Sequence, residues 1–482
     1  MATGVKAWKV GEKGSPFFPD EFEIVKKAVL QVTDIKTNHN KYYAIELHKG
    51  QHKGKTYFRI YTHYGRTDDL ETNPDAGQKE CRYFGTLAEA EAQYAGIYRE
   101  KTSSRKGYRE LALASTKIGS QKARGTSVGQ IDDKTLAKIK SKDRVVAVRK
   151  ASKLHPRVQE LVRYIYDEAK NALTSTVSAN ITAQGIETPL GILSIGQVEK
   201  GEKILMDLYN EVKRKKKNRQ KLEQLSGDFY TAVPHRIGRT RTAIASAVID
   251  GMAAIQQKQD TLQLMKDMLQ VNGEAGNVLF NARVDQEYEA LGCKVEVLEK
   301  TDSTYKELER HVVKSQIKTD SIKVKAIFKV RRDKEWTAFA DNIGNQRLLF
   351  HGSRIQNWVG ILSRGILLPK IVVSMGVNRT DEGWLGSGIY FGDASCTSAF
   401  YSSSGKKGTG FMAIVRVALG KMKDYHRITY GLSKPPDGFH SCHGVRCDDD
   451  VDSEFDDDEY VIYTAQQQRQ EYLVEFECDE CL

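Results

Sequence analysis

The spacing of apolar residues changes twice along this chain, and each change limits the folds that a segment can adopt. In the first hundred residues, period-two runs at 41–47 and 56–61 predict strands, and the pattern over 87–99 predicts an amphipathic helix. From Leu154 to about residue 270 the apolar residues recur at helical spacing. Strand-like runs return from about residue 285 onward. A chain of 482 residues with three such regions exceeds one core, so we predict a multidomain α+β protein.

The last region predicts a mixed, mainly antiparallel α/β domain. Gly-rich turns separate its short strands, and one short helix is predicted at 355–362. No G-x-G-x-x-G follows a strand, so a doubly wound nucleotide-binding sheet is not predicted. The strands are expected at 323–330, 347–350, 388–391, 411–419 and 471–477.

Composition indicates a linker between the first two regions. Glycines, small residues, Lys and Arg crowd residues 103–150, which is typical of a flexible basic linker, although a strand near 144–148 fits as well. Within the helical region, Ser194 followed by Gln197 predicts a helix start. We therefore expect a small α+β module at 1–118, the linker at 119–150, an all-α helical bundle at 151–284 and the mixed domain at 285–482.

The charge of the chain is uneven around a formal net value of +11. Basic residues crowd 100–220, and a basic half suggests nucleic acid as a polyanionic partner. Within that half, the run 213–217 fits either a nuclear targeting signal or a solvated helix end. The acidic run 448–459 is by default a solvated loop, with automodification sites or repulsion of DNA as alternatives. No run of eighteen apolar residues or signal-peptide pattern is found, so we expect the cytosol or the nucleus.

Seven cysteines with mostly long spacings argue against a disulfide framework. Cys442, His443 and Cys447, together with Cys478 and Cys481 at C-x-x-C spacing, offer enough ligands for zinc if the two groups meet in space. Such short spacings arise readily in intracellular chains, so we expect no metal.

Three blocks in the last region carry a family resemblance: Arg347–Arg354, Gly386–Asp393 and Gln470–Val474. In order and separation they resemble the signature blocks of the poly(ADP-ribose) polymerase catalytic domain. Further segments resemble the helical regulatory domain of that family and its DNA-sensing module named for Trp-Gly-Arg. The former are Pro189–Ser194 and Asp228–His235, and the latter are Lys41–Tyr43 and Tyr64–Arg66.

The resemblance implies a reaction that takes NAD⁺ as its substrate. Cleavage of the nicotinamide–ribose bond develops positive charge on the ribose, so the site must orient the ribose and place a carboxylate nearby. By resemblance, Tyr390 and Tyr401 sandwich the nicotinamide ring, and the backbone of Gly352 with the hydroxyl of Ser398 holds its carboxamide.

On the adenosine side, the resemblance implies that His351 binds the ribose, with help from Ser353. It also implies that Glu471 stabilises the cationic transition state and orients the acceptor hydroxyl, as in members that build polymers. We therefore expect Glu471, His351 and Tyr390 to be catalytic. Taken singly, each fits a structural role as well: a core histidine, a packed tyrosine and a charge on an edge strand.

Three departures from the family pattern bear on the product. Ser387 and Thr397 stand where the family commonly has lysines, and an arginine that supports the adenosine end is replaced around Leu367. These changes bear on NAD⁺ affinity and polymer length. Three hypotheses follow: a DNA-activated polymer-forming transferase, a mono-ADP-ribosyltransferase, and an inert scaffold that binds DNA ends.

At the N-terminal module, Tyr64 takes the position of the family's Trp, and Arg66 is retained. The resemblance implies that Tyr64 stacks on a sugar at a DNA break and that Arg66 contacts the backbone; a core role for Tyr64 is the alternative. The expected partners are DNA with strand breaks and acceptor proteins, the chain itself and histones among them. We expect a nuclear monomer without membrane contact, whose helical region inhibits the catalytic domain until DNA binds.

Overall fold

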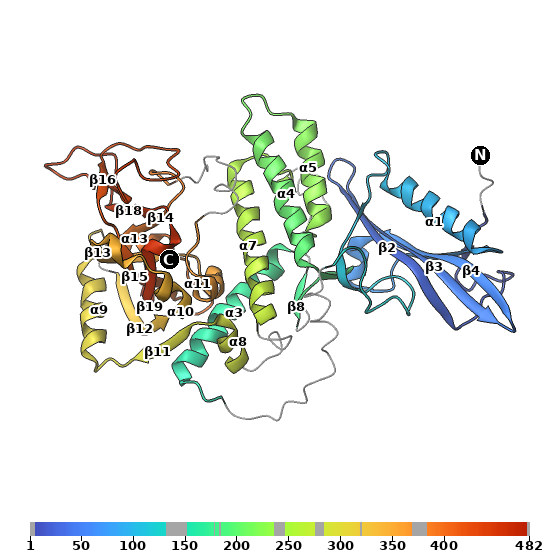
Figure 1. Ribbon diagram of the computed structural model, residues 1–482, viewed down its shortest axis with the longest axis horizontal. Coiled ribbons are helices and arrows are strands. Elements are labelled where there is room, and N and C mark those ends of the chain that lie inside the picture. Colours follow the sequence, from blue (N-terminus) through green and yellow to red (C-terminus); the bar gives the residue numbers. More distant parts are fainter. Residues whose placement is uncertain are drawn as a thin grey trace. The chain divides into compact units, whose positions relative to one another are not determined.

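The computed structural model describes residues 5–131, 152–177, 179–182, 185–235, 246–274, 284–318, 321–368 and 383–479. The described chain forms two compact units (Figure 1). The first unit contains the residues up to 131 and those from Leu173 to Leu269, and the second contains 152–172, 270–274 and the residues from 284 onward. Two helices, α3 (Pro156–Thr176) and α7 (Met252–Glu274), contribute to both units. The multidomain α+β class predicted from the sequence is confirmed.

The first unit begins with a six-stranded antiparallel sheet in the order β1-β5-β4-β3-β2-β6. Helix α1 (Leu87–Thr102) packs on it, and Thr86 and Glu89 cap the start of α1 by exchanging hydrogen bonds. The core between helix and sheet is apolar because alternate strand residues face α1. The strands are β1 (Trp8–Lys9), β2 (Phe22–Asp34), β3 (His39–His52), β4 (Lys55–Arg66), β5 (Gln78–Phe84) and β6 (Arg109–Glu110), with the short helix η1 (Thr67–Glu71) after β4.

The first part of the predicted linker is folded, which corrects the sequence-based expectation. Residues 111–114 are buried, and β7 (Leu113–Thr116) pairs with a strand of the helical region. Further on, the backbone N–H of Ser120 donates to the buried carboxylate of Glu46 at 2.7 Å. Burial of apolar side chains and this hydrogen bond stabilise the segment in a folded state, although its basic composition suggested a flexible one. The strand predicted near 144–148 lies outside the described residues.

The helical region contains α4 (Ile195–Val212), α5 (Arg219–Ala232), α7 (Met252–Glu274) and the end of α3. The predicted helix start is confirmed, since Ser194 Oγ accepts from the N–H of Gln197 at 3.2 Å. The region also holds a small antiparallel sheet that was not predicted, in the order β7-β10-β9-β8. Its strands are β8 (Asn180–Thr182), β9 (Gly185–Glu187) and β10 (Gly191–Leu193). Gly191, at φ 147°, is needed there because a Cβ would lie 2.0 Å from the carbonyl oxygen of Ser115.

The second unit is built on a nine-stranded sheet in the order β11-β12-β19-β15-β13-β14-β18-β17-β16. Every neighbouring pair is antiparallel except β16 and β17, which confirms a mainly antiparallel domain. The strands are β11 (Lys294–Leu298), β12 (Ile322–Arg331), β13 (Gln346–Gly352), β14 (Ile389–Gly392), β15 (Gly410–Ala418), β16 (Met422–Tyr425), β17 (Ser441–Gly444), β18 (Glu459–Ile462) and β19 (Gln468–Cys478).

Short helices cover this sheet. Apolar residues of α9 (Ser303–Lys314) and α13 (Ser395–Phe400) pack with Phe350, Ile414 and Val474 in one core. The other helices are α8 (Val284–Leu291), α10 (Asp333–Ala338), η3 (Asp341–Ile343), η4 (Ile355–Asn357), α11 (Trp358–Arg364) and η5 (Ala465–Gln467). Among the described residues, no helix combines the length and the apolar character that crossing a bilayer requires.

Candidate active site

Two adjacent strands and one helix bring most of the predicted site residues together. Strand β13 ends at His351 and Gly352, β14 carries Tyr390, and α13 carries Ser398 just before Tyr401. β13 and β14 are neighbours in the sheet, and α13 packs on the same strands. Residues from three separate segments of the chain therefore meet around β13, β14 and α13.

His351 is held in one tautomer. Its Nδ1 lies 2.9 Å from the carbonyl oxygen of Tyr390, which can only accept, so Nδ1 carries the proton and donates. Burial lowers the pKa of His351, and the hydrogen bond to Tyr390 offsets only part of this effect. The ring is therefore neutral near pH 7, and Nε2 offers a lone pair to a hydroxyl donor.

Gly352 touches the backbone of α13. A Cβ at this position would lie 1.7 Å from the carbonyl oxygen of Ser398, so no side chain fits without displacing the helix. Ser398 itself is buried, and Ser402 Oγ donates to its carbonyl oxygen at 3.2 Å. The close approach keeps the backbone of β13 next to α13.

The two predicted stacking tyrosines differ in their surroundings. The Tyr390 hydroxyl donates to the carbonyl of Gly386 at 2.6 Å and accepts from the N–H of Leu385 at 3.0 Å, which fixes its ring. Tyr401, in contrast, is 61% exposed. An exposed ring such as that of Tyr401 can stack on a planar ligand. Ser353 accepts two hydrogen bonds, one at its carbonyl and one at its hydroxyl, both from residues that follow it in the chain.

Glu471, the predicted catalytic carboxylate, does not join this cluster. It lies at a bulge in β19, where its carboxylate accepts from Arg416 Nε and Nη2 at 3.2 and 3.1 Å and from Arg469 Nε at 3.0 Å. Three strand spacings, about 14 Å, separate β19 from the β14 strand that carries Tyr390. The two guanidinium groups already neutralise the carboxylate.

A different carboxylate lies beside the cluster. Glu459 begins β18 and pairs directly with Gly392, two residues after Tyr390 in the adjacent strand. Paired residues of an antiparallel sheet point to the same face. A Cβ at Gly392 would approach Thr397 of α13, so the side chain of Glu459 lies on the α13 face. Its neighbour Gly392 has no side chain, whereas the ring of Phe455 fills the space over its other neighbour, Gly444.

The charge state of Glu459 is unusual. Burial, followed by the negative charges of Asp457 and Asp456, raises the pKa of Glu459 to about 7. Its Oε2 atom is buried and accepts no hydrogen bond from any residue that the structure describes. Partial desolvation and then the charges of Glu459 and Asp457 raise the pKa of the Tyr401 hydroxyl, so the carboxylate acts on the site. Perturbed carboxylates of this kind mark functional sites.

The sequence contained a signal for Glu459 that was missed. The run Glu459–Tyr463 is rich in β-formers and predicts a strand, but the acidic residues before it were interpreted as a loop. In the structure β18 lies between β14 and β17.

Ion pairs connect β18, the strand that carries Glu459, to the strands on both sides of it. His443 of β17 lies between Asp424 and Asp458, with ring nitrogens 2.9 and 2.8 Å from their carboxylates. Burial lowers the pKa of His443, but the bonds to Asp458 and Asp424 outweigh burial and raise it. Arg446 joins Asp458 to Asp393, the residue after Gly392, at 3.2 and 3.0 Å. The strand that carries Glu459 is therefore tied to both of its neighbours.

The residues proposed for zinc do not form a site in the described part of the chain. Cys442 and His443 are consecutive on β17 and point to opposite faces. Burial raises the pKa of the Cys442 thiol, which disfavours the thiolate that zinc requires. Cys481 lies outside the described residues, and no group of three potential ligands occurs within them.

At the N-terminal module, Tyr64 and Arg66 end β4. One face of the Tyr64 ring stacks on Tyr43 at 5.3 Å, and its hydroxyl donates to Glu80 at 2.7 Å. Arg66 pairs with Asp68 at 3.0 Å and remains partly exposed. Burial lowers the pKa of His39, and the positive charges of Lys41 and Arg66 lower it further against a smaller opposing effect of Asp34. The two cations thus create a positive potential at His39.

The second unit therefore combines a mainly antiparallel sheet with a histidine, two tyrosines and a desolvated carboxylate around α13. Three family models match this chain. The WGR domain matches residues 26–114, the poly(ADP-ribose) polymerase regulatory domain matches 152–275, and the poly(ADP-ribose) polymerase catalytic domain matches 302–450. The chain belongs to the poly(ADP-ribose) polymerase family, which confirms the resemblance seen in the sequence.

Relatives with assigned names include both mono- and polymer-forming enzymes. The human protein mono-ADP-ribosyltransferase PARP4 is 29% identical over 467 residues, which are 96% of this chain and 24% of that protein. The mouse protein mono-ADP-ribosyltransferase PARP3 is 28% identical, over 92% of this chain and 87% of that protein. The poly [ADP-ribose] polymerase of Drosophila melanogaster is 28% identical, over 86% of this chain and 40% of that protein. The chain spans about a quarter of the length of PARP4.

Proposed function

We propose that this protein is an NAD⁺-dependent ADP-ribosyltransferase that releases nicotinamide and transfers ADP-ribose to protein side chains, its own included. We further propose that DNA breaks activate it and that it extends the product into a polymer. The observation that carries the proposal is the meeting of His351, Tyr390 and Tyr401 with a desolvated carboxylate on the α13 face of one sheet. Family membership supports the choice of NAD⁺ as the substrate.

The nicotinamide end of the substrate would bind between Tyr401 and Tyr390. The exposed ring of Tyr401 can stack on the base, and the fixed ring of Tyr390 can form the opposite wall. The backbone of Gly352 and the hydroxyl of Ser398 are available for the carboxamide. Towards the adenosine, the Nε2 lone pair of His351 can accept from a ribose hydroxyl, with Ser353 beside it.

We propose Glu459 as the catalytic carboxylate in place of Glu471. When ionised, it would stabilise the positive charge that develops on the ribose and accept a hydrogen bond from a ribose or acceptor hydroxyl. Its unpartnered Oε2 supports this role, because a buried acceptor without a donor is costly unless a ligand supplies one. Glu471 would instead stabilise the fold through Arg416 and Arg469.

DNA binding is proposed for the N-terminal module, through Arg66 and Tyr64. The positive potential around Arg66, Lys41 and His39 supports contact with phosphates. Since Tyr43 covers one face of the Tyr64 ring, only the other face can stack on a sugar. The remaining proposals are a nuclear location, a monomeric state, and histones among the acceptors.

The test is incorporation of labelled NAD⁺ by the wild-type protein, with and without nicked or blunt-ended DNA, and by Glu459→Gln and Glu471→Gln. We expect DNA-dependent, high-molecular-weight product from the wild type and from Glu471→Gln, and none from Glu459→Gln. No labelling under any condition, despite DNA binding, would support the inert-scaffold alternative.

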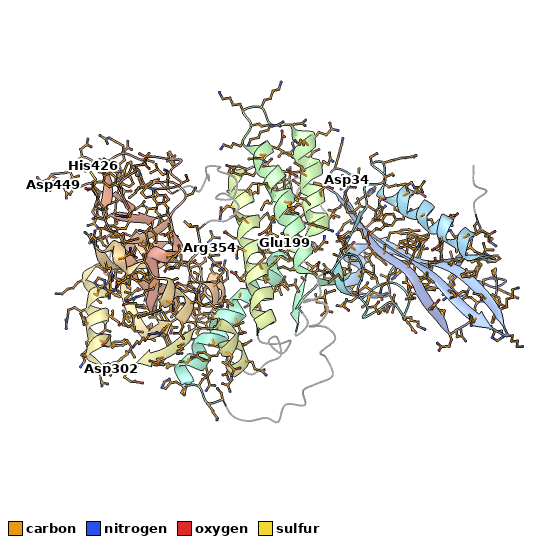
Figure 2. The ribbon with its side chains drawn as sticks, viewed as in Figure 1. Asp34, Glu199, Asp302, Arg354, His426 and Asp449 are labelled. Carbon is orange, nitrogen blue, oxygen red and sulfur yellow. The ribbon has the colours of Figure 1, made fainter. Side chains whose placement is uncertain are left out.

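One observation favours transfer of a single unit as a second candidate. Asp456, Asp457 and Asp458 directly precede Glu459, and the first two raise its pKa, so they act on the site electrostatically. A growing polymer end carries a pyrophosphate, which this negative charge would repel. The acidic run continues back to Asp449, which Figure 2 shows at the edge of the second unit beside His426. A discrete labelled band in place of a smear would identify this outcome.

A further inference from the structure

The loop at 402–409 joins Tyr401 to β15, and helix α3 satisfies its backbone polar groups. The hydroxyl of Tyr164 donates to the carbonyl oxygen of Thr409 at 3.0 Å and accepts from the N–H of Lys407 at 3.3 Å. A carboxylate oxygen of Glu168, one turn further along α3, accepts from the N–H of Lys406 at 2.9 Å. Thr409 is buried and its carbonyl needs a partner, so the Tyr164 hydroxyl and the Glu168 carboxylate together tie this loop conformation to α3.

Packing strengthens the same contact. Tyr164 is only 2% exposed, and its ring lies 5.9 Å from that of Phe411 at the start of β15. A Cβ at Gly405 would lie 2.6 Å from the Tyr164 hydroxyl and 2.8 Å from the carboxyl carbon of Glu168. The loop therefore approaches α3 so closely that position 405 has no room for a side chain.

Two ion pairs surround these buried contacts. Lys406 Nζ lies 2.7 Å from Asp167, and Lys407 Nζ lies 2.8 Å from Glu160. All four side chains are between one third and about one half exposed, so each pair stabilises the contact weakly, by about 0.2–1 kcal/mol. The hydrogen bonds of Tyr164 and Glu168 to the loop backbone are the stronger part of the contact.

The other end of the loop contacts both sides of the candidate active site. Ser402 Oγ donates to the carbonyl of Phe411 at 3.0 Å and to that of Ser398 at 3.2 Å. Ser403 Oγ accepts from the N–H of Ile355, two residues after Ser353, at 3.2 Å. A shift of the loop would therefore move both α13, which precedes Tyr401, and the segment that follows His351.

We propose that Tyr164 and Glu168 of α3 are positioning residues for NAD⁺ binding, acting through the 402–409 loop. The inference rests on the function proposed above. Helix α3 is the first helix of the region matched by the regulatory-domain model, yet its residues 156–172 belong to the second compact unit. The start of that region thus forms part of the framework of the nucleotide site, independently of any inhibitory role of the helices that follow.

The chain contains a matched control for Tyr164. Tyr166 lies on the same helix, is 1% exposed, and donates one hydrogen bond to a backbone carbonyl, that of Glu287, at 2.9 Å. That carbonyl belongs to α8 and not to the loop. Tyr164→Phe and Tyr166→Phe each remove one hydroxyl from a buried tyrosine of α3, so a general loss of stability should affect both alike.

The experiment measures KM for NAD⁺, kcat and Tm of the full-length protein. We expect Tyr164→Phe to raise KM about fivefold to tenfold, because its hydroxyl makes two hydrogen bonds to the loop backbone, with kcat within about twofold of wild type. Tyr166→Phe should lower Tm similarly and leave KM unchanged. Equal KM values for Tyr164→Phe and wild type, or equal increases in both variants, would overturn the proposal.

Glu168 provides a second, independent variant. Glu168→Gln keeps a side-chain acceptor for the Lys406 N–H and should keep KM near wild type, whereas Glu168→Ala should raise it. Calorimetric titration with NAD⁺ measures binding without turnover. If the wild type neither binds nor turns over NAD⁺, the proposed function itself fails; if it does both and these variants match it, only the positioning role fails.

Discussion

Replacing Glu459 by Gln keeps the size of the side chain and removes a charge from a desolvated position. Two opposite effects should follow in the same protein. ADP-ribose transfer should fall by at least about a hundredfold, because an amide cannot stabilise a developing cation as a carboxylate does. The folded state should become more stable at neutral and alkaline pH, because the native structure no longer holds a buried anion.

The size of the stability gain follows from the pKa of Glu459. Its ordinary value is 4.5 and its value in the structure is about 7, a difference worth about 3 kcal/mol at 1.36 kcal/mol per pKa unit. Because the pKa is raised, the native state binds the extra proton between pH 4.5 and 7, and wild-type stability falls as pH rises through this window. We therefore expect Glu459→Gln to gain about 3 kcal/mol at pH 8 and less than about 1 kcal/mol at pH 5.

The matched control is Glu471→Gln, which should behave in the opposite way. It removes the charge that Arg416 and Arg469 neutralise, so stability should drop by about 1–3 kcal/mol. Its activity should stay within about threefold of wild type at a temperature where it is folded.

Thermal unfolding of both variants at pH 5 and pH 8, together with transfer rates, checks the reasoning. The pH profile of wild-type kcat/KM should also rise about tenfold from pH 6 to pH 8, as Glu459 ionises. The argument is refuted if Glu471→Gln folds normally and loses transfer while Glu459→Gln retains it. A wild-type profile that is flat between pH 6 and 8 would be equally damaging.

Three further predictions follow from single contacts. Gly352→Ala should raise KM for NAD⁺ more than tenfold and destabilise the folded state by about 1–3 kcal/mol, because its Cβ would collide with Ser398. Gly96→Ala is the control in unfolding and kinetic assays, since a Cβ there meets nothing within 4 Å. Arg66→Ala should weaken binding of nicked DNA and reduce its salt dependence by about one charge, measured by fluorescence anisotropy from 50 to 200 mM salt. His443→Gln should cost about 1 kcal/mol below pH 6.5, a loss that vanishes as pH rises through the raised pKa of His443; a pH-independent loss in denaturant unfolding would contradict this.

Local sequence pattern was enough to predict most of the elements of this protein. The strands around residues 347–350 and 411–419 lie within one residue or two of β13 and β15, and the Ser194 cap formed as predicted. Such features depend on neighbours within a few residues, where periodicity and capping act. The choice of His351, Gly352, Tyr390, Ser398 and Tyr401 came from the sequence, and the structure places His351 next to Tyr390 and Gly352 next to Ser398.

Strand order, register and burial were decided only by the tertiary structure. Glu471 and Glu459 both stand near the start of β-rich runs, and nothing local distinguishes them. Pairing places Glu459 beside Gly392, while a bulge in β19 turns Glu471 towards two arginines. Two further features depend on partners far along the chain. One is the folded part of the linker, and the other is the contact of Tyr164 with the 402–409 loop, where Thr409 is 245 residues away in sequence. The sequence thus determined which chemical groups are present. The long-range pairing of strands determined which carboxylate is paired with arginines and which is desolvated without one, because desolvation and charge depend on neighbours that only the fold brings together.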